Sequence, residues 1–301
     1  MKAIPSYPKI LSLGSAYTEN ALVGDVIVQE KVDGSQFSFG LNEDGEMVMR
    51  SKGAILTNEN HAEMFREAVE YVQSIEKEFK RVVKPDTYIY CEYLQKPKHN
   101  TLKYTRIPQN HLVLFDILSE GKYESRSFME IMSLSLGIDL IPEFYRGIMD
   151  VDKIKEFLET ESYLGGETLE GIVIKNYTQT ILLGGQVFPL LTKYVREAFK
   201  ERHSADWKVR QPKGALQEFI DGFKTEARWQ KAIIHAKEKG LLTQSPKDIG
   251  ILIKMVQEDI KEEETENIKN HLYKCFIDDI TRKSTQGFPE WYKEQLLLNL
   301  K

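Results

Sequence analysis

A chain of 301 residues with 41% hydrophobic residues is too long for one small core and too apolar for disorder, so we expect one large or two medium domains. The formal net charge of −5 excludes a chain that binds nucleic acid as a polycation over its whole surface. Cys91 and Cys275 are far apart and match no metal-binding spacing, so we expect two inert thiols in a reducing compartment.

The N-terminal residues 1–15 lack the apolar block of a signal peptide. No run in the sequence is long and apolar enough to span a bilayer. We therefore expect a soluble, cytoplasmic protein that makes no membrane contact.

The first two thirds of the chain mix predicted strands and helices. A strand is expected from Val26, and "QFSFGL", "NEDG" and "EMVMR" (36–50) together have the pattern of a hairpin. Helices are predicted where apolar residues recur at helical spacing: 59–80, 125–136 and 151–160. Further strands are predicted where β-branched and aromatic residues gather: 86–94, 111–118 and 169–177.

The pattern changes near His203, and from Gly214 onward almost no strand signal remains. Residues 215–240 have an amphipathic helical pattern, broken or continuous, and 245–283 begin with a serine N-cap and a proline before a helical run. The acidic "KEEETE" within that run is expected to be a solvated helix face. We place a boundary between 203 and 214, which predicts domains at 1–203 and 214–301.

Positive charge gathers in two segments. Residues 96–106 carry four lysines and arginines and no acid, and residues 193–213 carry seven against three acids. Each segment fits either an ordinary solvated surface or a track for nucleic-acid phosphates.

Lys31 lies in an apolar run, "VIVQEKV", and is followed closely by Asp33 and Gly34. A lone lysine at a strand end is usually a surface residue. A lysine amine becomes a nucleophile when burial or nearby positive charge deprotonates it, and such an amine can attack a carbonyl or an α-phosphate. Gly34 allows a ligand to approach the backbone closely.

Other charged residues stand at the ends of apolar strands or within them. The residues are Glu92, Asp116, Glu170, Lys175 and Lys193. Any one of them alone would be interpreted as a charged residue on an edge strand. Their repeated occurrence instead favours strands that converge on a polyanionic ligand. The sequence has no GxxxxGK[ST] loop, no HExxH and no Cys/His metal array.

Six segments between Glu30 and Val195 then carry a family resemblance: "EKVDGS", "RSKG", "CEYL", "VLFD", "EGIVIK" and "LTKYV". In order and approximate spacing they resemble the nucleotidyltransferase motifs shared by ATP-dependent ligases and capping enzymes. A helical tail stands where an OB-like segment would be expected, so the chain is most similar to the phage T4 RNA ligase 2 group. The implied fold class is α+β: a nucleotidyltransferase domain of antiparallel sheets with flanking helices, followed by an all-helical C-terminal domain.

The resemblance implies roles for the residues around the nucleotide. Lys31 would attack the α-phosphate of ATP, expel pyrophosphate and become lysyl-AMP. Glu30 would help to read the adenine edge, and Phe115 would stack on the adenine. Glu92 would hold the ribose hydroxyls, and Arg50 would bind phosphate or the RNA end.

The same resemblance implies a cluster around the phosphates. Glu170 would help to place a divalent metal, Mg²⁺ or alternatively Mn²⁺. Lys175 and Lys193 would grip the α-phosphate, and their charge is expected to lower the pKa of Lys31. The AMP would then pass to an RNA 5′-phosphate, and a 3′-hydroxyl would close the phosphodiester.

The resemblance also associates three residues with the nucleic-acid end or the metal: Asp33, Gln36 and Asp116. The RNA ligase 2 group usually has histidine where this chain has Asp33, which is closer to DNA ligases. Gln36 is instead closer to the RNA ligase 2 group, because that group has an amide at this position, whereas DNA ligases usually have arginine there. The last motif usually has two lysines one residue apart. Here Lys193 is followed by Tyr194 and Val195, so either the second lysine is missing or Lys193 fills its place.

The implied activity is ATP-dependent joining of RNA 3′-OH and 5′-phosphate ends, with a nicked duplex as the expected substrate and a monomer as the expected form. The expected location includes the cytoplasm of a phage-infected host. Alternatives are an ATP-dependent DNA or mixed-substrate ligase, a GTP-dependent capping enzyme and an inactive nucleic-acid-binding module. The tail contains none of these motifs, so we expect either a nucleic-acid clamp or a cover for apolar surface.

Overall fold

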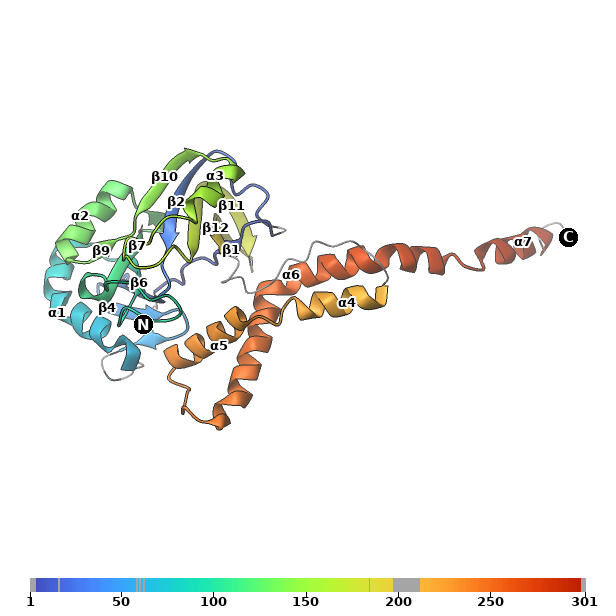
Figure 1. The fold of residues 1–301 in the computed structure, drawn as a ribbon. Coiled ribbons are helices and arrows are strands. Elements are labelled where there is room, and N and C mark those ends of the chain that lie inside the picture. Colours follow the sequence, from blue (N-terminus) through green and yellow to red (C-terminus); the bar gives the residue numbers. More distant parts are fainter. Residues whose placement is uncertain are drawn as a thin grey trace.

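The computed structural model describes residues 4–15, 17–57, 59, 61, 63–183, 185–196 and 212–298. Most of the predicted domain boundary, 203–214, lies outside these residues, as does most of the basic segment 193–213. Two β-sheets with flanking helices form the larger part of the molecule, and the C-terminal helices extend away from it (Figure 1).

The first sheet has five strands in the order β1-β12-β11-β2-β10. Its strands are β1 (Leu11–Ser12), β2 (Asp25–Lys31), β10 (Glu143–Ile148), β11 (Gly171–Leu183) and β12 (Gln186–Val195). All pairs are antiparallel except β1 with β12. Strand β2 occupies an inner position, where its alternate residues Val26 and Val28 are fully buried.

The second sheet has the order β5-β4-β3-β6-β7-β8, and β9 pairs in parallel with β7. Its strands are β3 (Ser35–Leu41), β4 (Met47–Ser51), β5 (Ile55–Leu56), β6 (Thr87–Tyr93), β7 (Leu112–Ser119), β8 (Lys122–Tyr123) and β9 (Asp139–Leu140). The predicted hairpin at 36–50 is confirmed as the antiparallel pair β3 and β4.

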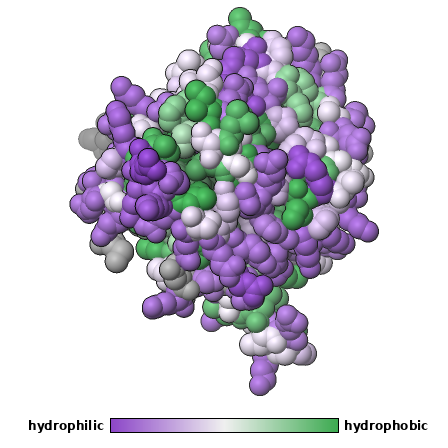
Figure 2. Space-filling model, turned by 90° about the vertical axis from the view of Figure 1, so that its left-hand side faces the viewer, coloured by the Kyte–Doolittle hydropathy of each residue, from purple (hydrophilic) through white to green (hydrophobic). Residues whose placement is uncertain are grey.

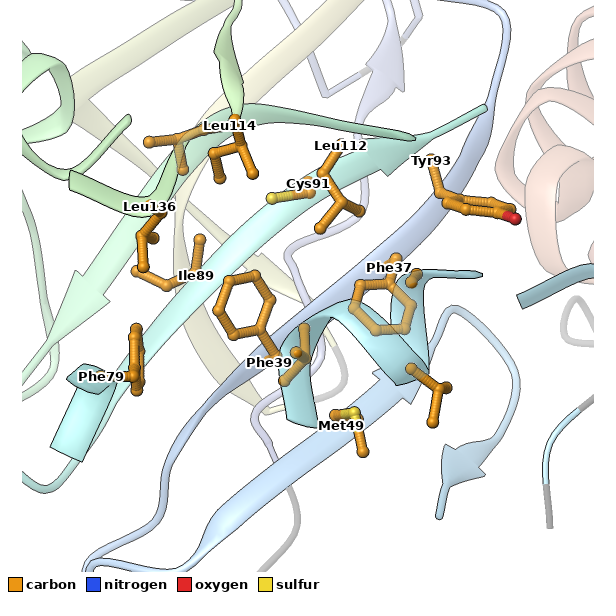
Figure 3. Close-up of a cluster of buried hydrophobic side chains, with 14 of the residues drawn as sticks. Phe37, Phe39, Met49, Phe79, Ile89, Cys91, Tyr93, Leu112, Leu114 and Leu136 are labelled. Atoms are coloured by element: carbon orange, nitrogen blue, oxygen red, sulfur yellow. The ribbon is translucent and has the colours of Figure 1, made fainter. Parts of the chain in front are cut away.

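Helices cover the outer face of the second sheet. The 3₁₀ turn η1 (Glu63–Phe65) leads into α1 (Arg66–Val82), whose apolar face buries Val69, Val72 and Phe79. Helix α2 (Arg126–Leu136) begins at the N-cap Ser125 and ends at Gly137, whose φ of 59° suits glycine. Figure 3 shows the resulting core, in which Phe79 and Leu136 from these helices meet Phe37, Phe39 and Ile89 of the sheet. The short helix α3 (Val151–Phe157) packs on the first sheet through Ile154.

The C-terminal region is helical throughout its described part, as expected. It comprises α4 (Pro212–Asp221), α5 (Glu226–Glu238), the turn η4 (Pro246–Asp248), α6 (Ile249–Ser284) and α7 (Phe288–Leu298). The break predicted as one option within 215–240 occurs between α4 and α5, and Thr225 caps α5. Ser245 forms a capping box with Asp248. The expected α+β fold of antiparallel sheets followed by helices is confirmed.

A buried arginine joins α5 to α6. Arg228 is 1% exposed and donates to Asp259 and to Glu264, with 2.8 Å to the latter. Glu264 belongs to the "KEEETE" tract and is itself buried, so the expectation of a fully solvated face is wrong at that position. The tract supplies one half of an internal ion pair because a buried guanidinium needs carboxylate partners.

The outer surface is mainly polar. On the face shown in Figure 2, hydrophilic residues surround smaller apolar patches. Within the described ranges, none of the helices combines the length and the apolar character that a bilayer span requires.

Candidate active site

A cavity of about 1240 Å³ lies beside the end of β2. Residues of both sheets, of the N-terminal segment and of helices α5 and α6 line it. Every residue predicted for the site lines this cavity except Asp116: Glu30, Lys31, Asp33, Gln36, Arg50, Glu92, Phe115, Glu170, Lys175 and Lys193. Residues far apart in sequence are therefore gathered around one space that is large enough for a nucleotide.

Lys31 and Glu170 form the ion pair at the centre of the cavity. Lys31 is the last residue of β2 and pairs in register with Gly171, which places Glu170 beside it. Lys31 Nζ lies 2.5 Å from Glu170 Oε2. The β2–β11 register therefore fixes the amine and the carboxylate against each other.

The pKa of Lys31 is raised, so the expectation that it would be lowered is wrong for this arrangement. Burial alone disfavours the ammonium, but the contact with Glu170 and the charges of Glu92 and Asp33 together outweigh it. Lys31 is therefore held as a cation. It must lose a proton before it can act as a nucleophile.

Glu92 lies in β6 opposite Gln36 of β3, and both line the cavity. Burial raises the pKa of Glu92 to about 8; Lys31 opposes the shift, and the carboxylates of Glu170, Glu238 and Asp33 add to it. Glu92 is therefore largely protonated at neutral pH. A protonated carboxyl has a hydroxyl donor and a carbonyl acceptor, and both can bind sugar hydroxyls.

We expect Glu92→Gln to raise stability at alkaline pH and to have little effect near pH 4. The ordinary glutamate pKa is near 4.5, against about 8 in the folded chain. Between these values the unfolded chain is ionised at this residue while the folded chain keeps the proton, so the folded state loses stability as pH rises. Glutamine stays neutral and escapes this loss. Thermal unfolding from pH 4 to pH 9 measures the difference, and a constant gap between variant and wild type would contradict it.

Close packing against strand β6 explains why position 34 is a glycine. A Cβ atom at this position would lie 2.6 Å from Glu92 Cγ and 2.8 Å from the Tyr93 carbonyl oxygen. The close approach is thus to strand β6 within the chain. Any larger residue would push Glu92 out of the cavity wall.

Asp33 anchors the basic segment 96–106. Its carboxylate accepts hydrogen bonds from the backbone N–H groups of Thr101 and Leu102, each at 2.7 Å. Its own N–H donates to the hydroxyl of Tyr104 at 2.8 Å. These bonds give Asp33 a structural task that is independent of any metal or nucleic-acid end.

Glu30 faces a loop rather than open solvent. It is 3% exposed and accepts hydrogen bonds from the Ser162 hydroxyl and from the Tyr163 N–H, the latter at 3.1 Å. Burial raises its pKa, while the two hydrogen bonds act in the opposite direction. Glu30 thereby ties β2 to the loop before β11 at the edge of the cavity.

Lys175 and Asp116 form a second, more deeply buried ion pair. Their side chains are 2% and 1% exposed, with Lys175 Nζ 2.9 Å from Asp116 Oδ2. Asp116 also accepts hydrogen bonds from the hydroxyls of Tyr7 and Tyr177 at 2.7 and 2.6 Å, and Lys175 donates to the Phe115 carbonyl oxygen at 2.6 Å. The burial of Asp116 argues against its expected contact with a metal or a nucleic-acid end.

Phe115 is half-buried and lines the cavity beside Tyr7. The two ring centroids are 5.0 Å apart, with an interplanar angle of 80°. This edge-to-face contact fixes the orientation of Phe115 and leaves part of it within the cavity wall. An adenine stacked on that part is compatible with this packing.

We expect Phe115→Leu to weaken adenine-nucleotide binding less than Phe115→Ala, because leucine still covers a purine face. Truncation to alanine also removes core contacts, so thermal unfolding must be followed in parallel. Nucleotide titration of the folded variants separates the two effects. Equal loss of stability in both variants with unchanged nucleotide affinity would assign Phe115 to packing alone.

Arg50 and Lys193 bring positive charge to the cavity from separate strands. Arg50 of β4 donates to the Ile4 carbonyl oxygen at 2.7 Å, which holds the N-terminal segment. Lys193 of β12 pairs in register with Val173 and Ser12, and its charge acts on Glu170. Lys193 thus lies on the same side of the cavity as the Lys31–Glu170 pair.

Sequence patterns did not predict that the helical tail would line this cavity. Gln230, Lys231, His235 and Glu238 of α5 form part of its wall, as do 262–267 of α6. Burial, followed by the charges of Lys52 and Lys231, lowers the pKa of His235 to about 4. No local motif encodes this contact, because it depends on how α5 packs against the sheets.

A protein-family model matches the part of the chain that contains most of the two sheets. Residues 24–195, more than half of the chain, match the model of the RNA ligase family, and the chain belongs to that family. The matched segment begins just before β2 and ends with β12, so it includes every predicted site residue. No curated protein sequence matches the chain.

Several solved structures are similar in part. An archaeal ATP-dependent RNA ligase has 17% identity and a TM-score of 0.45, covering 88% of this chain and 66% of its own. An RNA ligase of Naegleria gruberi with PPi has 13% identity and a TM-score of 0.45, covering 64% and 58%. A putative ATP-dependent DNA ligase from Aquifex aeolicus has 18% identity and a TM-score of 0.43, covering 95% and 68%. The chain thus spans less than two thirds of the first two, and likenesses of this degree support no conclusion about its reaction.

Proposed function

We propose that this protein is an ATP-dependent RNA ligase that joins 3′-OH and 5′-phosphate ends through a lysyl-AMP intermediate. The observation that carries the proposal is the position of Lys31. It ends an inner strand, lines a nucleotide-sized cavity and contacts Glu170, all within the segment that matches the RNA ligase family.

In the first step, the Lys31 ammonium releases a proton to solvent and its nitrogen lone pair attacks the α-phosphorus of ATP. A nitrogen–phosphorus bond forms while the bond from the α-phosphorus to the bridging oxygen breaks. Pyrophosphate leaves with the electron pair, and the nitrogen loses a second proton to solvent. Positioning and neutralisation of charge supply most of the catalysis in such in-line displacements. Lys193 is placed to supply part of the neutralising charge.

In the second step, an RNA 5′-phosphate oxygen attacks the adenylyl phosphorus while the nitrogen–phosphorus bond breaks. The Lys31 nitrogen leaves with the electron pair and takes up a proton from solvent. In the third, the 3′-hydroxyl loses its proton and attacks the 5′-phosphorus, and AMP leaves. Both steps need the RNA ends inside the cavity. The basic segment 96–106, which Asp33 holds through Thr101 and Leu102, borders that space and is our candidate for a phosphate track.

We propose Mg²⁺ as the metal, with Mn²⁺ as the alternative. Over the residues that the structure describes, no group of three or more His, Cys, Asp or Glu side chains is arranged to hold a metal. Mg²⁺ is usually bound by one or two carboxylates together with substrate phosphates, so a complete protein cage is not required. Glu170 offers carboxylate oxygens in the cavity wall and would hold the ion beside the phosphates. When bound, it would neutralise phosphate charge.

The rival closest to this proposal is an ATP-dependent DNA or mixed-substrate ligase. Its main support in the sequence is Asp33. The structure explains Asp33 by its bonds to the backbone of Thr101 and Leu102, so that support becomes weaker. Membership of the T4 RNA ligase 2 group and a preference for nicked duplex RNA remain parts of the proposal.

Nick sealing tests the proposal. The full chain is incubated with ATP, Mg²⁺ and duplexes whose single nick is flanked by RNA on both sides, by RNA on the 3′-OH side alone, or by DNA on both sides. We expect sealing that depends on an RNA 3′-OH end and stops when the metal is chelated. Equal sealing of the DNA nick would favour the DNA ligase alternative, and labelling of the protein by GTP would favour a capping enzyme. A folded chain that forms no adduct with either nucleotide would be a binding module.

A further inference from the structure

Helices α5 and α6 are seated on the two-sheet part at several points. The Thr101 hydroxyl donates to Gln230 Oε1 of α5 at 3.1 Å. Lys9 Nζ donates to the Glu262 carbonyl oxygen of α6 at 2.7 Å and lies 3.7 Å from Glu263. The contacts come from two parts of the chain, the 96–106 segment and the N-terminal segment. Together they hold α5 and α6 against the two-sheet part, where both helices line the cavity.

Three lysines from three elements meet in this part of the cavity. Lys52 follows β4, Lys193 belongs to β12 and Lys231 belongs to α5, and all three line the same space. Enclosure by the cavity walls, followed by the charges of Lys231 and Lys193, lowers the pKa of Lys52. His235 lies one turn after Lys231 on α5 and faces the same lysines.

Acidic residues of α5 and α6 lie close to Lys52 and Lys231. Lys231 Nζ is 2.6 Å from Asp259 and 4.0 Å from Glu263, which fixes its side chain against α6. The charges of Glu263 and Glu238 act on the pKa of Lys52 in the opposite direction to those of Lys231 and Lys193. An anion between Lys52 and Lys231 would relieve their mutual repulsion.

We propose that α5 completes the nucleotide site by forming an anion subsite with the two-sheet part, in which Lys52, Lys231 and His235 bind the β- and γ-phosphates of ATP. This inference rests on the proposed function. The same subsite would hold pyrophosphate as the bond between the α-phosphorus and its bridging oxygen breaks and the electron pair passes to the leaving group. The Lys52 and Lys231 cations would stabilise that developing charge, and His235, whose pKa of about 4 leaves it neutral near pH 7, would offer a ring N–H donor. The tail therefore acts in the first step.

The test uses the full chain and three lysine-to-glutamine variants, which remove charge and keep most of the side chain. Lys52→Gln and Lys231→Gln alter the subsite from opposite sides. Lys254→Gln is the matched control, because Lys254 is an exposed lysine of α6 outside the cavity wall. Thermal unfolding checks each fold. Lys52 follows β4 and lies outside the α5–α6 ion pairs, so its variant keeps the test valid if Lys231→Gln loosens the helices.

Two reactions distinguish whether the subsite binds pyrophosphate or an RNA phosphate. The adenylylated chain is mixed with limiting pyrophosphate to regenerate ATP, and the chain without AMP is mixed with a nick that already carries adenylylated RNA. We expect each subsite variant to regenerate ATP on the order of tenfold more slowly, as the loss of a charge-assisted contact implies. Sealing of the adenylylated nick should stay at the wild-type rate, and Lys254→Gln should match wild type in both.

Other outcomes overturn the inference. Loss of nick sealing with normal ATP regeneration would assign the lysines to RNA phosphate. Unchanged rates in both reactions would remove the subsite. Calorimetric titration with pyrophosphate distinguishes failure of this inference from failure of the proposed function. If the wild-type chain binds pyrophosphate through Lys52 and Lys231 but never forms an AMP adduct, the anion subsite is retained and the ligase assignment is lost.

Discussion

Replacement of Lys31 by alanine should abolish covalent attachment of AMP to the protein. The nitrogen that would attack phosphorus is lost, and with it the contact to Glu170 that the β2–β11 register sets up. Lys31→Arg is the matched control for charge. It can keep an ion pair with Glu170, but its guanidinium stays protonated and is no nucleophile. We expect neither variant to gain the mass of one AMP.

Intact mass after incubation with ATP and Mg²⁺ measures this effect, with circular dichroism as the check on folding. Because the ion pair is partly exposed, with side chains 26% and 12% exposed, its loss should cost little stability. An AMP adduct on the folded Lys31→Ala variant would remove Lys31 as the nucleophile. Adduct formation by Lys31→Arg would have the same consequence.

The second large effect concerns stability and the pair of Lys175 and Asp116. Lys175→Met should destabilise the fold by about 3–5 kcal/mol, the usual cost of leaving a buried charge without its partner. Asp116 would keep two tyrosine donors, Tyr7 and Tyr177, but lose its cation. Asp116→Asn should cost a similar amount, because it leaves the ammonium of Lys175 buried with the Phe115 carbonyl oxygen.

A double-mutant cycle in urea measures the coupling of this pair. The double variant, Lys175→Met with Asp116→Asn, should be less destabilised than the sum of the single variants, since neither charge is then left alone. A Lys175→Met variant that loses less than about 1 kcal/mol, a loss typical of exposed pairs, and yet cannot form the adduct would contradict the structural assignment. It would instead favour the α-phosphate contact that the sequence resemblance implies.

Local patterns predict much of the fold, and the exceptions have physical reasons. The hairpin β3–β4, helices α1 and α2 and the capped start of the α6 region follow from alternation, helical spacing and the Ser245 cap. Strand β12 was expected only through the apolar run that ends at Lys193, and it contains Pro189, a residue that usually argues against a strand. In the structure Pro189 pairs with Thr180, beside a register shift between Asn176 and Thr180. The irregularity accommodates the proline, and it cannot be read from the sequence.

The site was predictable as a set of residues and less so as a set of contacts. Ordered motifs identified which residues would meet, and the cavity brings them together except for Asp116. The charge state of Lys31 depends on Glu170, a partner 139 residues away that β-sheet register selects. The contribution of Lys231 and His235 depends on the packing of α5, for which no short motif exists.

Transfer of AMP from the protein to RNA tests the central claim most directly. The full chain is adenylylated with α-labelled ATP, separated from nucleotide, and mixed with a nicked duplex that carries an RNA 3′-OH end and a 5′-phosphate end. We expect the label to leave Lys31, appear on the RNA 5′ end and then be released as AMP as the nick closes. Label that stays on the folded protein, or a nick that closes in the chain lacking the Lys31 amine, would contradict the account.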